Sequence, residues 1–229
     1  MKQKIRVDVV SDVVCPWCYI GKRRLEKAMT ALGDRFEFEV AYHPFELNPG
    51  QALEGVNQKE YLTDKFGGDA RYEQLTGHVT SIAAEDGIAF DYDKQLISPN
   101  TRAAHRMAQL AGEEGVQQPV IEALFKAYFT DGVDLSKKEN LIQVGAGAGL
   151  DATKIDKLLS SDDKTAEVIA SEKQMQQLGV TGVPFYIINS KYGVSGAQQP
   201  QAFIDAFNQI GLETVATEGD SCAVDGKDC

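Results

Sequence analysis

The chain has 229 residues, of which 43% are hydrophobic and 25% are charged. A chain of this size and composition can bury a core as one domain, or as one domain with a large insertion, which excludes a disordered protein. Its formal net charge is −11 and it has no cluster of lysine and arginine. This charge argues against nucleic acid or an anionic membrane as a partner.

The first residues of the chain carry charges and lack the apolar segment of a secretory signal. No stretch approaches the roughly 18 apolar residues that are needed to span a bilayer. We therefore expect a cytoplasmic protein without a membrane partner. In a reducing compartment, the four cysteines are more typical of catalysis, redox sensing or metal binding than of structural disulfides.

The N-terminal third predicts a strand, a helix and a second strand. The first strand is indicated by its apolar residues, Ile5, Val7, Val9 and Val10. A helical stripe of apolar residues then extends to Leu32 and ends at Gly33. The second strand is indicated by alternation of apolar and polar residues through Phe36, Phe38, Val40 and Tyr42.

The motif Cys15-Pro16-Trp17-Cys18 lies where the first strand ends and the helix begins. With Cys15 as the N-cap, Pro16 takes the first helical position, where a missing N–H costs nothing. The free N–H groups of Trp17 and Cys18 point back at the Cys15 sulfur, and the helix dipole favours its thiolate. We therefore expect Cys15 to be the nucleophile and Cys18, one turn into the helix, to be the resolving thiol.

Helix signals dominate residues 57–178. Asn57 with Glu60, and Ser136 with Glu139, predict capping boxes at two helix starts. The chain then returns to a strand pattern at residues 183–188, followed by a short partner strand at 192–195. A last helix is predicted from Pro200 to just before Gly211.

This order of elements, βαβ followed by ββα, predicts an α/β thioredoxin fold with a large inserted all-helical domain. We expect residues 1–50 and 179–211 to form the thioredoxin-like domain and residues 51–178 to form the insertion. Residues 212–229 are expected to be a C-terminal tail that carries a second cysteine pair.

Five segments together give the chain a resemblance to the DsbA-like thiol:disulfide oxidoreductases of the FrnE type. This group is related to the kappa-class glutathione transferases and the 2-hydroxychromene-2-carboxylate isomerases. The segments are residues 11–21, 44–49, 100–106, 179–184 and 194–198. The resemblance covers nearly all of residues 5–211.

The resemblance implies roles for three further residues. Pro184 matches a proline that in this family is cis and faces the active disulfide, which would expose the Val183 backbone to a substrate strand beside Cys15. The alternative is an ordinary proline at a strand edge. His105 lies on the helix that resembles the family's active-site-facing helix, where it is a candidate to tune the thiolate or contact substrate; the alternative is a structural histidine.

Two residues close to the thiols in the sequence are candidate functional residues because of their position alone. Asp12, three residues before Cys15, either shuttles a proton or simply ends the strand. Trp17 is expected to line an apolar substrate groove, and packing against the inserted helices is a compatible alternative.

The second cysteine pair, Cys222 and Cys229, would close only a short loop in the tail, so stability is a poor reason for it. We expect this auxiliary pair to exchange with Cys15 and Cys18 or to sense redox state. The alternative is that these are adventitious cysteines in a tail.

Three functions compete. The leading one is a cytosolic thiol:disulfide oxidoreductase or isomerase without a cofactor, acting on protein or small-molecule thiols and disulfides, with glutathione or another thiol as redox partner. The second is a glutathione-dependent transferase or isomerase, although such relatives generally carry serine at the Cys15 position and no partner at Cys18. The third is a non-enzymatic zinc site made of Cys15, Cys18, Cys222 and Cys229. The sequence leaves open the direction of exchange and the choice between monomer and homodimer.

Overall fold

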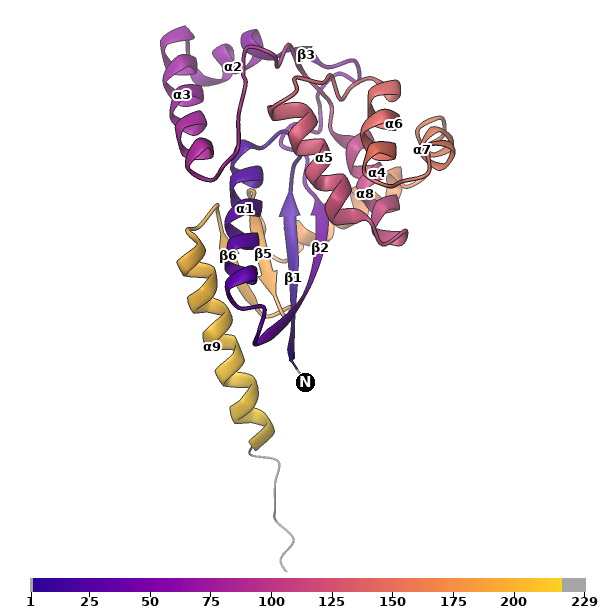
Figure 1. The fold of residues 1–229 in the computed structure, drawn as a ribbon. Helices are drawn as coiled ribbons and strands as arrows, with labels where there is room; N and C mark the ends of the chain where they lie inside the picture. Colours follow the sequence, from indigo (N-terminus) through magenta and orange to yellow (C-terminus); the bar gives the residue numbers. More distant parts are fainter. Residues whose placement is uncertain (1, 220–229) are drawn as a thin grey trace, which may run out of the picture.

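The structure is a computed structural model that describes residues 2–219. Its centre is a four-stranded sheet in the order β2-β1-β5-β6 (Figure 1). The strands are β1 (Gln3–Ser11), β2 (Phe36–Pro44), β5 (Phe185–Ile188) and β6 (Tyr192–Ser195). β1 pairs in parallel with β2, whereas β5 is antiparallel to both β1 and β6. The predicted thioredoxin fold is confirmed.

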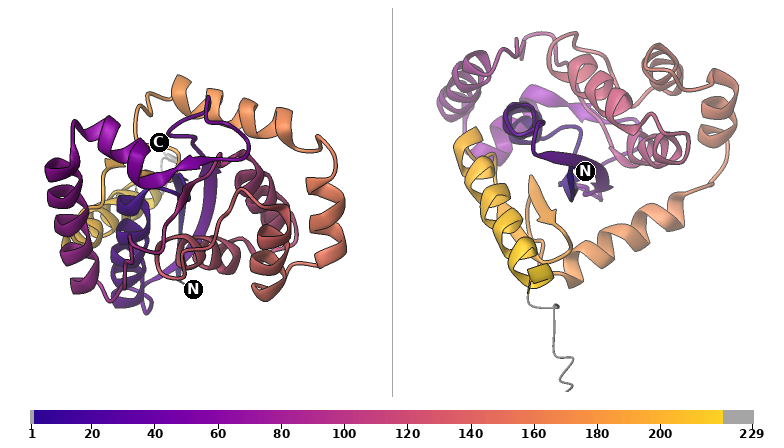
Figure 2. Two further views of the ribbon diagram at one scale, coloured as in Figure 1. Left: turned by 90° about the horizontal axis from the view of Figure 1, so that it is seen from above. Right: turned by 60° about the horizontal axis from the view of Figure 1, so that its bottom comes forward.

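Two helices lie side by side along the sheet, α1 (Pro16–Ala31) and α9 (Pro200–Gly219) (Figures 1 and 2). Aromatic rings pack between α9 and the sheet. The rings of Phe203 and Tyr186 of β5 have a centroid distance of 4.8 Å, and those of Phe207 and Phe38 of β2 have one of 4.9 Å. All of these rings except Phe38 are completely buried. This apolar contact fixes α9 relative to the sheet.

The prediction that the last helix ends before Gly211 is wrong, because α9 continues to Gly219. The structure gives the glycine a packing role: a Cβ atom at Gly211 would lie 2.8 Å from Cζ of Phe36. The glycine therefore permits close contact between α9 and β2, and it does not end the helix.

The chain between β2 and β5 is mainly helical and covers the end of the sheet where β1 ends and α1 begins (Figures 1 and 2). It also contains a short antiparallel ladder, β3 (Val56–Asn57) with β4 (Ile97–Ser98), which we did not expect. The helices are α2 (Gln58–Phe66), α3 (Asp69–Glu85), α4 (Arg102–Glu113), α5 (Gln117–Phe129), α6 (Lys138–Gly147), α7 (Ala152–Leu159) and α8 (Thr165–Gln177).

One of the two predicted caps is confirmed. The Asn57 side chain accepts a hydrogen bond from the Glu60 N–H at 3.0 Å at the start of α2. The prediction for Ser136 is wrong, because α6 begins one residue after Lys137 and the Ser136 hydroxyl donates to Asp134 at 2.6 Å instead. The nearby Asp134 carboxylate outcompetes the helix start for this hydroxyl.

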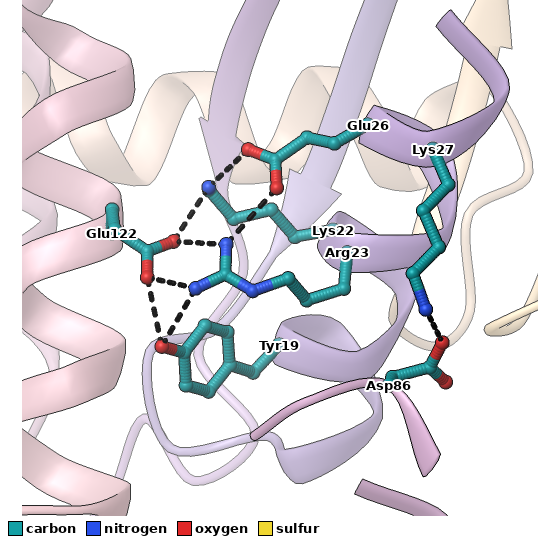
Figure 3. A network of polar contacts seen from close by, with 7 residues as sticks. All are labelled: Tyr19, Lys22, Arg23, Glu26, Lys27, Asp86 and Glu122. Carbon is teal, nitrogen blue, oxygen red and sulfur yellow. Dashed lines mark hydrogen bonds and ion pairs between the residues drawn. The ribbon is translucent and has the colours of Figure 1, made fainter. Parts of the chain in front are cut away.

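Charged residues connect α1 to the insertion (Figure 3). Glu122 of α5 accepts hydrogen bonds from Lys22 at 2.6 Å, from Arg23 Nη1 at 2.8 Å and from the Tyr19 hydroxyl at 2.8 Å. Burial alone would raise the pKa of Glu122, but its bonds with Arg23 and Lys22 and their charges lower the pKa to about 2. At the end of α3, Asp86 pairs with the buried Arg24 at 2.6 Å.

We expect Glu122→Gln to lower the free energy of unfolding by about 2 kcal/mol at pH 7, because the ion pairs with α1 are lost. The folded-state pKa lies below the ordinary value of 4.5, so this stabilisation is present above pH 4.5 and is lost as the pH falls toward 2. Urea denaturation of both proteins between pH 7 and pH 3 measures the difference. If the difference in the free energy of unfolding between the two proteins does not narrow at low pH, the ion pairs of Glu122 do not account for it. The control is Glu85→Gln, at an exposed position.

Candidate active site

Cys15 and Cys18 lie at the N-terminal end of α1, as the sequence predicts. Cys15 is the N-cap residue in an extended conformation, with φ −90° and ψ 112°, and Pro16 opens the helix. The Cys15 N–H donates to the Asp12 carbonyl at 3.0 Å, and the Cys18 N–H donates to the Cys15 carbonyl at 3.0 Å. Both cysteines are free thiols. The local backbone therefore holds Cys15 at the N-terminal end of the helix.

The loop before β5 lies next to this thiol. Val183-Pro184 is a cis peptide bond, and the Val183 carbonyl oxygen is 3.8 Å from Cys15 Sγ. The close approach depends on Gly21, where a Cβ atom would clash with the Tyr186 hydroxyl and lie 3.3 Å from Cγ of Pro184. The pairing of β5 with β1 thus brings Val183 and Pro184 to the thiols.

The two thiols differ in their surroundings. Burial raises the pKa of the Cys18 thiol well above its ordinary value, and its hydrogen bond to Cys15 and the charge of Cys15 add to this effect. Contacts with the Asp12 backbone and with Ser11 oppose the increase only in part. Burial therefore favours the protonated form of the Cys18 thiol.

A cavity of about 400 Å³ opens beside Cys15. Pro16, Trp17 and Val183 form one side of it, and the insertion forms the rest. Trp17, with 37% of its surface exposed, lies against the cavity as expected for a residue that contacts substrate. Most of the wall from the insertion is apolar or aromatic: Leu62, Leu75, Val79, Tyr92, Tyr128 and Phe129.

Asp12 also lines this cavity, and its carboxylate is held from behind. One oxygen accepts the Leu47 N–H at 2.8 Å, and the other lies 3.3 Å from Nε2 of His105. Burial lowers the pKa of His105, but Asp12, with the charges of Glu172 and Glu46, raises it overall. Asp12 therefore favours the protonated form of His105.

The sequence offers His105 as a residue that tunes the thiolate or contacts substrate, or as a structural histidine, and the structure places it beside Asp12. Its side chain is only 4% exposed, and it lies behind Asp12 and outside the wall of the cavity. A buried neighbour of a carboxylate can position that carboxylate but cannot reach a ligand in the cavity.

Several cavity residues were not found from the sequence, notably Gln58, Lys65, His78 and Gln95. They come from α2, α3 and the loop before β4, and no motif marks them. Only the packing of the insertion over α1 brings these residues to the thiol. Cys222 and Cys229 lie outside the described residues. Within residues 2–219, no group of three or more His, Cys, Asp and Glu side chains is arranged to hold a metal ion.

A pair of free thiols at this helix start, with a cis proline beside them, defines a thioredoxin-fold dithiol protein. Residues 6–208 match the family described as DSBA-like thioredoxin domain. The chain belongs to this family, and the predicted resemblance is confirmed at that level.

Two of the matching proteins illustrate the similarity over most of the chain. A probable DsbA oxidoreductase from Streptomyces coelicolor has a crystal structure with a TM-score of 0.83 and 34% sequence identity, covering 98% of this chain and 94% of its own. The Bacillus subtilis protein YwbO, which is uncharacterized, is 23% identical over 209 residues, covering 89% of this chain and 96% of its own.

More distant structures share the fold. The cytosolic disulfide reductase DsbM from Pseudomonas aeruginosa has a TM-score of 0.64 at 18% identity, covering 91% of this chain and 99% of its own, and it has also been solved with glutathione. A 2-hydroxychromene-2-carboxylate isomerase has a TM-score of 0.66 at 17% identity, covering 93% of this chain and 98% of its own.

We expect iodoacetamide to label Cys15 at pH 8 while Cys18 stays unmodified, because Cys15 faces the cavity and the raised pKa of Cys18 keeps it protonated. Peptide mass mapping of the reduced protein separates the two sites from Cys222 and Cys229. In Cys15→Ala, Cys18 should still resist labelling. Equal labelling of both thiols would contradict the different surroundings that the structure gives them.

Proposed function

We propose that the protein is a thiol:disulfide oxidoreductase that uses Cys15 as nucleophile and Cys18 as resolving thiol. The observation that carries this proposal is the free Cys15 thiol at the start of α1, open to a cavity and next to the Val183 carbonyl, with Cys18 buried behind it. The same geometry also fits a reductase or an isomerase. The direction of thiol–disulfide exchange depends on the reduction potential of the Cys15–Cys18 pair.

The exchange has two steps. In the first, the Cys15 thiolate attacks one sulfur of a substrate disulfide, the substrate S–S bond breaks, and the other half leaves as a thiolate that takes up a proton. In the second, Cys18 loses its proton and attacks the Cys15 sulfur, which releases the remaining substrate thiol. The substrate is reduced to two thiols, and the enzyme is oxidised to a Cys15–Cys18 disulfide.

Cys18 needs a proton acceptor in the second step, since its pKa is raised. We assign this role to Asp12, whose backbone contacts Cys15 and whose side chain lines the same cavity. His105 then acts as a positioning residue, because its charge holds the buried Asp12 carboxylate in place. Asp12 also ends β1 and binds the Leu47 N–H, so the structural reading of this residue is compatible with the catalytic one.

The substrates that we propose are protein or small-molecule thiols and disulfides, with Trp17, Val183 and Pro184 as contact residues. Glutathione is a candidate redox partner, supported by the structure of DsbM with glutathione. A glutathione-dependent transferase or isomerase is the second candidate. A cavity of about 400 Å³ favours it, because a cavity of this size suits a small molecule. The pair of thiols, Cys15 and Cys18, favours thiol–disulfide exchange over this second candidate.

A cytoplasmic location, a monomer or homodimer, and the absence of a cofactor stay part of this proposal. The fold shared with a cytosolic DsbM supports the location. No helix among residues 2–219 is long and apolar enough to cross a membrane. Exchange between the active pair and Cys222 with Cys229, and a FrnE-type assignment, stay predictions.

Cys15→Ser should abolish the protein's acceleration of insulin reduction by dithiothreitol and leave only the uncatalysed rate, because no nucleophile remains, whereas Cys18→Ser should accumulate mixed disulfides that are visible by mass spectrometry. The double variant Cys222→Ser/Cys229→Ser is the matched control, since it removes two thiols but keeps the active pair. Full activity of Cys15→Ser would overturn the proposal. Activity that survives Cys18→Ser together with tight glutathione binding would favour the transferase.

His105→Gln should slow the release of mixed disulfides about tenfold, because the charge that orients Asp12 is lost. Because the pKa of His105 is raised, the imidazole is fully protonated well below neutral pH. It loses its proton only above pH 6.5, the ordinary pKa of histidine. The wild-type rate should therefore show an inflection above pH 6.5 that His105→Gln lacks. His43→Gln, at the separate pair with Asp8, is the control. An unchanged pH profile in His105→Gln would show that His105 is merely structural.

A further inference from the structure

The cavity beside Cys15 is bordered by three buried glutamines that differ in their hydrogen bonding. Gln51 uses both ends of its amide: Nε2 donates to the Ser98 carbonyl at 2.8 Å, and Oε1 accepts from Asn48. This residue ties two loops together. Gln58 and Gln95, in contrast, each keep one amide atom without a partner.

Gln95 presents an acceptor. Its Nε2 lies 3.4 Å from two backbone carbonyls, those of Asp91 and Phe129, and only the amide nitrogen can donate to them. The orientation of the side chain is therefore fixed, and Oε1 is the atom left without a partner. The residue is only 3% exposed.

Gln58 presents a donor. Its Oε1 accepts from the Tyr72 hydroxyl at 3.3 Å, which leaves Nε2 without a partner. Gln58 is 1% exposed, and its backbone N–H donates to the Leu96 carbonyl at 3.0 Å, so the residue is fixed to the ladder of β3 and β4. Like Gln95, it lines the cavity.

Buried polar atoms without partners are rare in folded proteins because each loses its bonds to water. Here Gln58 and Gln95, which carry one such donor and one such acceptor, both line the largely apolar cavity that opens at the reactive thiol. A secondary amide has the matching groups, a C=O to accept from Gln58 and an N–H to donate to Gln95. A cavity of about 400 Å³ holds a small molecule of this kind.

We propose that Gln58 and Gln95 form an amide-binding subsite, and that the cavity takes a small thiol or disulfide whose apolar body carries a secondary amide. This inference rests on the proposed function and adds a substrate class to it. The ligand carbonyl accepts from Gln58 Nε2, the ligand N–H donates to Gln95 Oε1, and the ligand sulfur lies at Cys15. Exchange then follows the two steps given above, with the ligand disulfide reduced and the Cys15–Cys18 pair oxidised.

The test compares two probe disulfides that differ in one atom on each arm. Diacetylcystamine carries an amide on each arm, and its ester analogue has an oxygen in place of each N–H. The reduced full-length protein is mixed with each probe, and oxidation is followed by the fluorescence of Trp17, the single tryptophan. We expect the amide probe to react about tenfold faster, because only it can donate to Gln95.

The variants separate the two hydrogen bonds. Gln95→Met should abolish the preference for the amide probe. Gln58→Met should slow both probes by a similar factor and keep the preference, since both probes have a carbonyl. Gln109→Met is the matched control, because Gln109 also has an unpartnered buried oxygen but lies outside this cavity. It should change neither rate.

Hydroxyethyl disulfide, which has no carbonyl, reports whether each variant is folded and competent in exchange. Equal rates of the wild type with the amide and ester probes, or a preference that survives Gln95→Met, would overturn the amide subsite while leaving the oxidoreductase function intact. If the reduced protein reacts faster with an extended peptide disulfide but not with diacetylcystamine, the amide subsite is likewise overturned. The cavity would then bind a protein segment. Failure of the oxidoreductase function itself would appear as unreacted hydroxyethyl disulfide.

Discussion

The ion pairs between α1 and the insertion are the constraint on which the site depends. Lys22 and Arg23 bind Glu122 of α5, and Arg24 binds Asp86 at the end of α3. These charges are largely removed from water, so their separation is costly and the helix is fixed in place. Because α1 carries both thiols at its start, the same contacts fix the cavity over Cys15. The thiols thus lie at the start of α1 and most of the cavity wall comes from the insertion, so these ion pairs join the two parts of the site.

The site separates its two thiols by their environment more than by their position in the sequence. Cys15 faces the cavity and the Val183 carbonyl, whereas Cys18 is enclosed by the core and keeps its proton. Under the proposed function, this difference orders the exchange, since one sulfur meets the substrate and the other completes the reaction. In the proposed function, Asp12 of the buried Asp12–His105 pair is the proton acceptor.

Sequence and structure agree where the signal is local. The cap at Asn57 depends on a backbone N–H three residues away, and the start of α1 at Pro16 depends on adjacent residues. The predictions fail where a distant or competing group intervenes. Asp134 takes the hydroxyl of Ser136, and Phe36 explains the glycine at position 211 inside a continuous helix.

By itself, the sequence determined the order of strands and helices, the thioredoxin fold and the placement of Cys15 and Cys18 at a helix start, because periodicity and capping act over a few residues. Only the tertiary structure decided that His105 lies behind Asp12 and that Gln58 and Gln95 border the cavity. Those placements depend on the packing of the insertion against α1. Contacts between residues far apart in the chain have no local pattern from which they can be read.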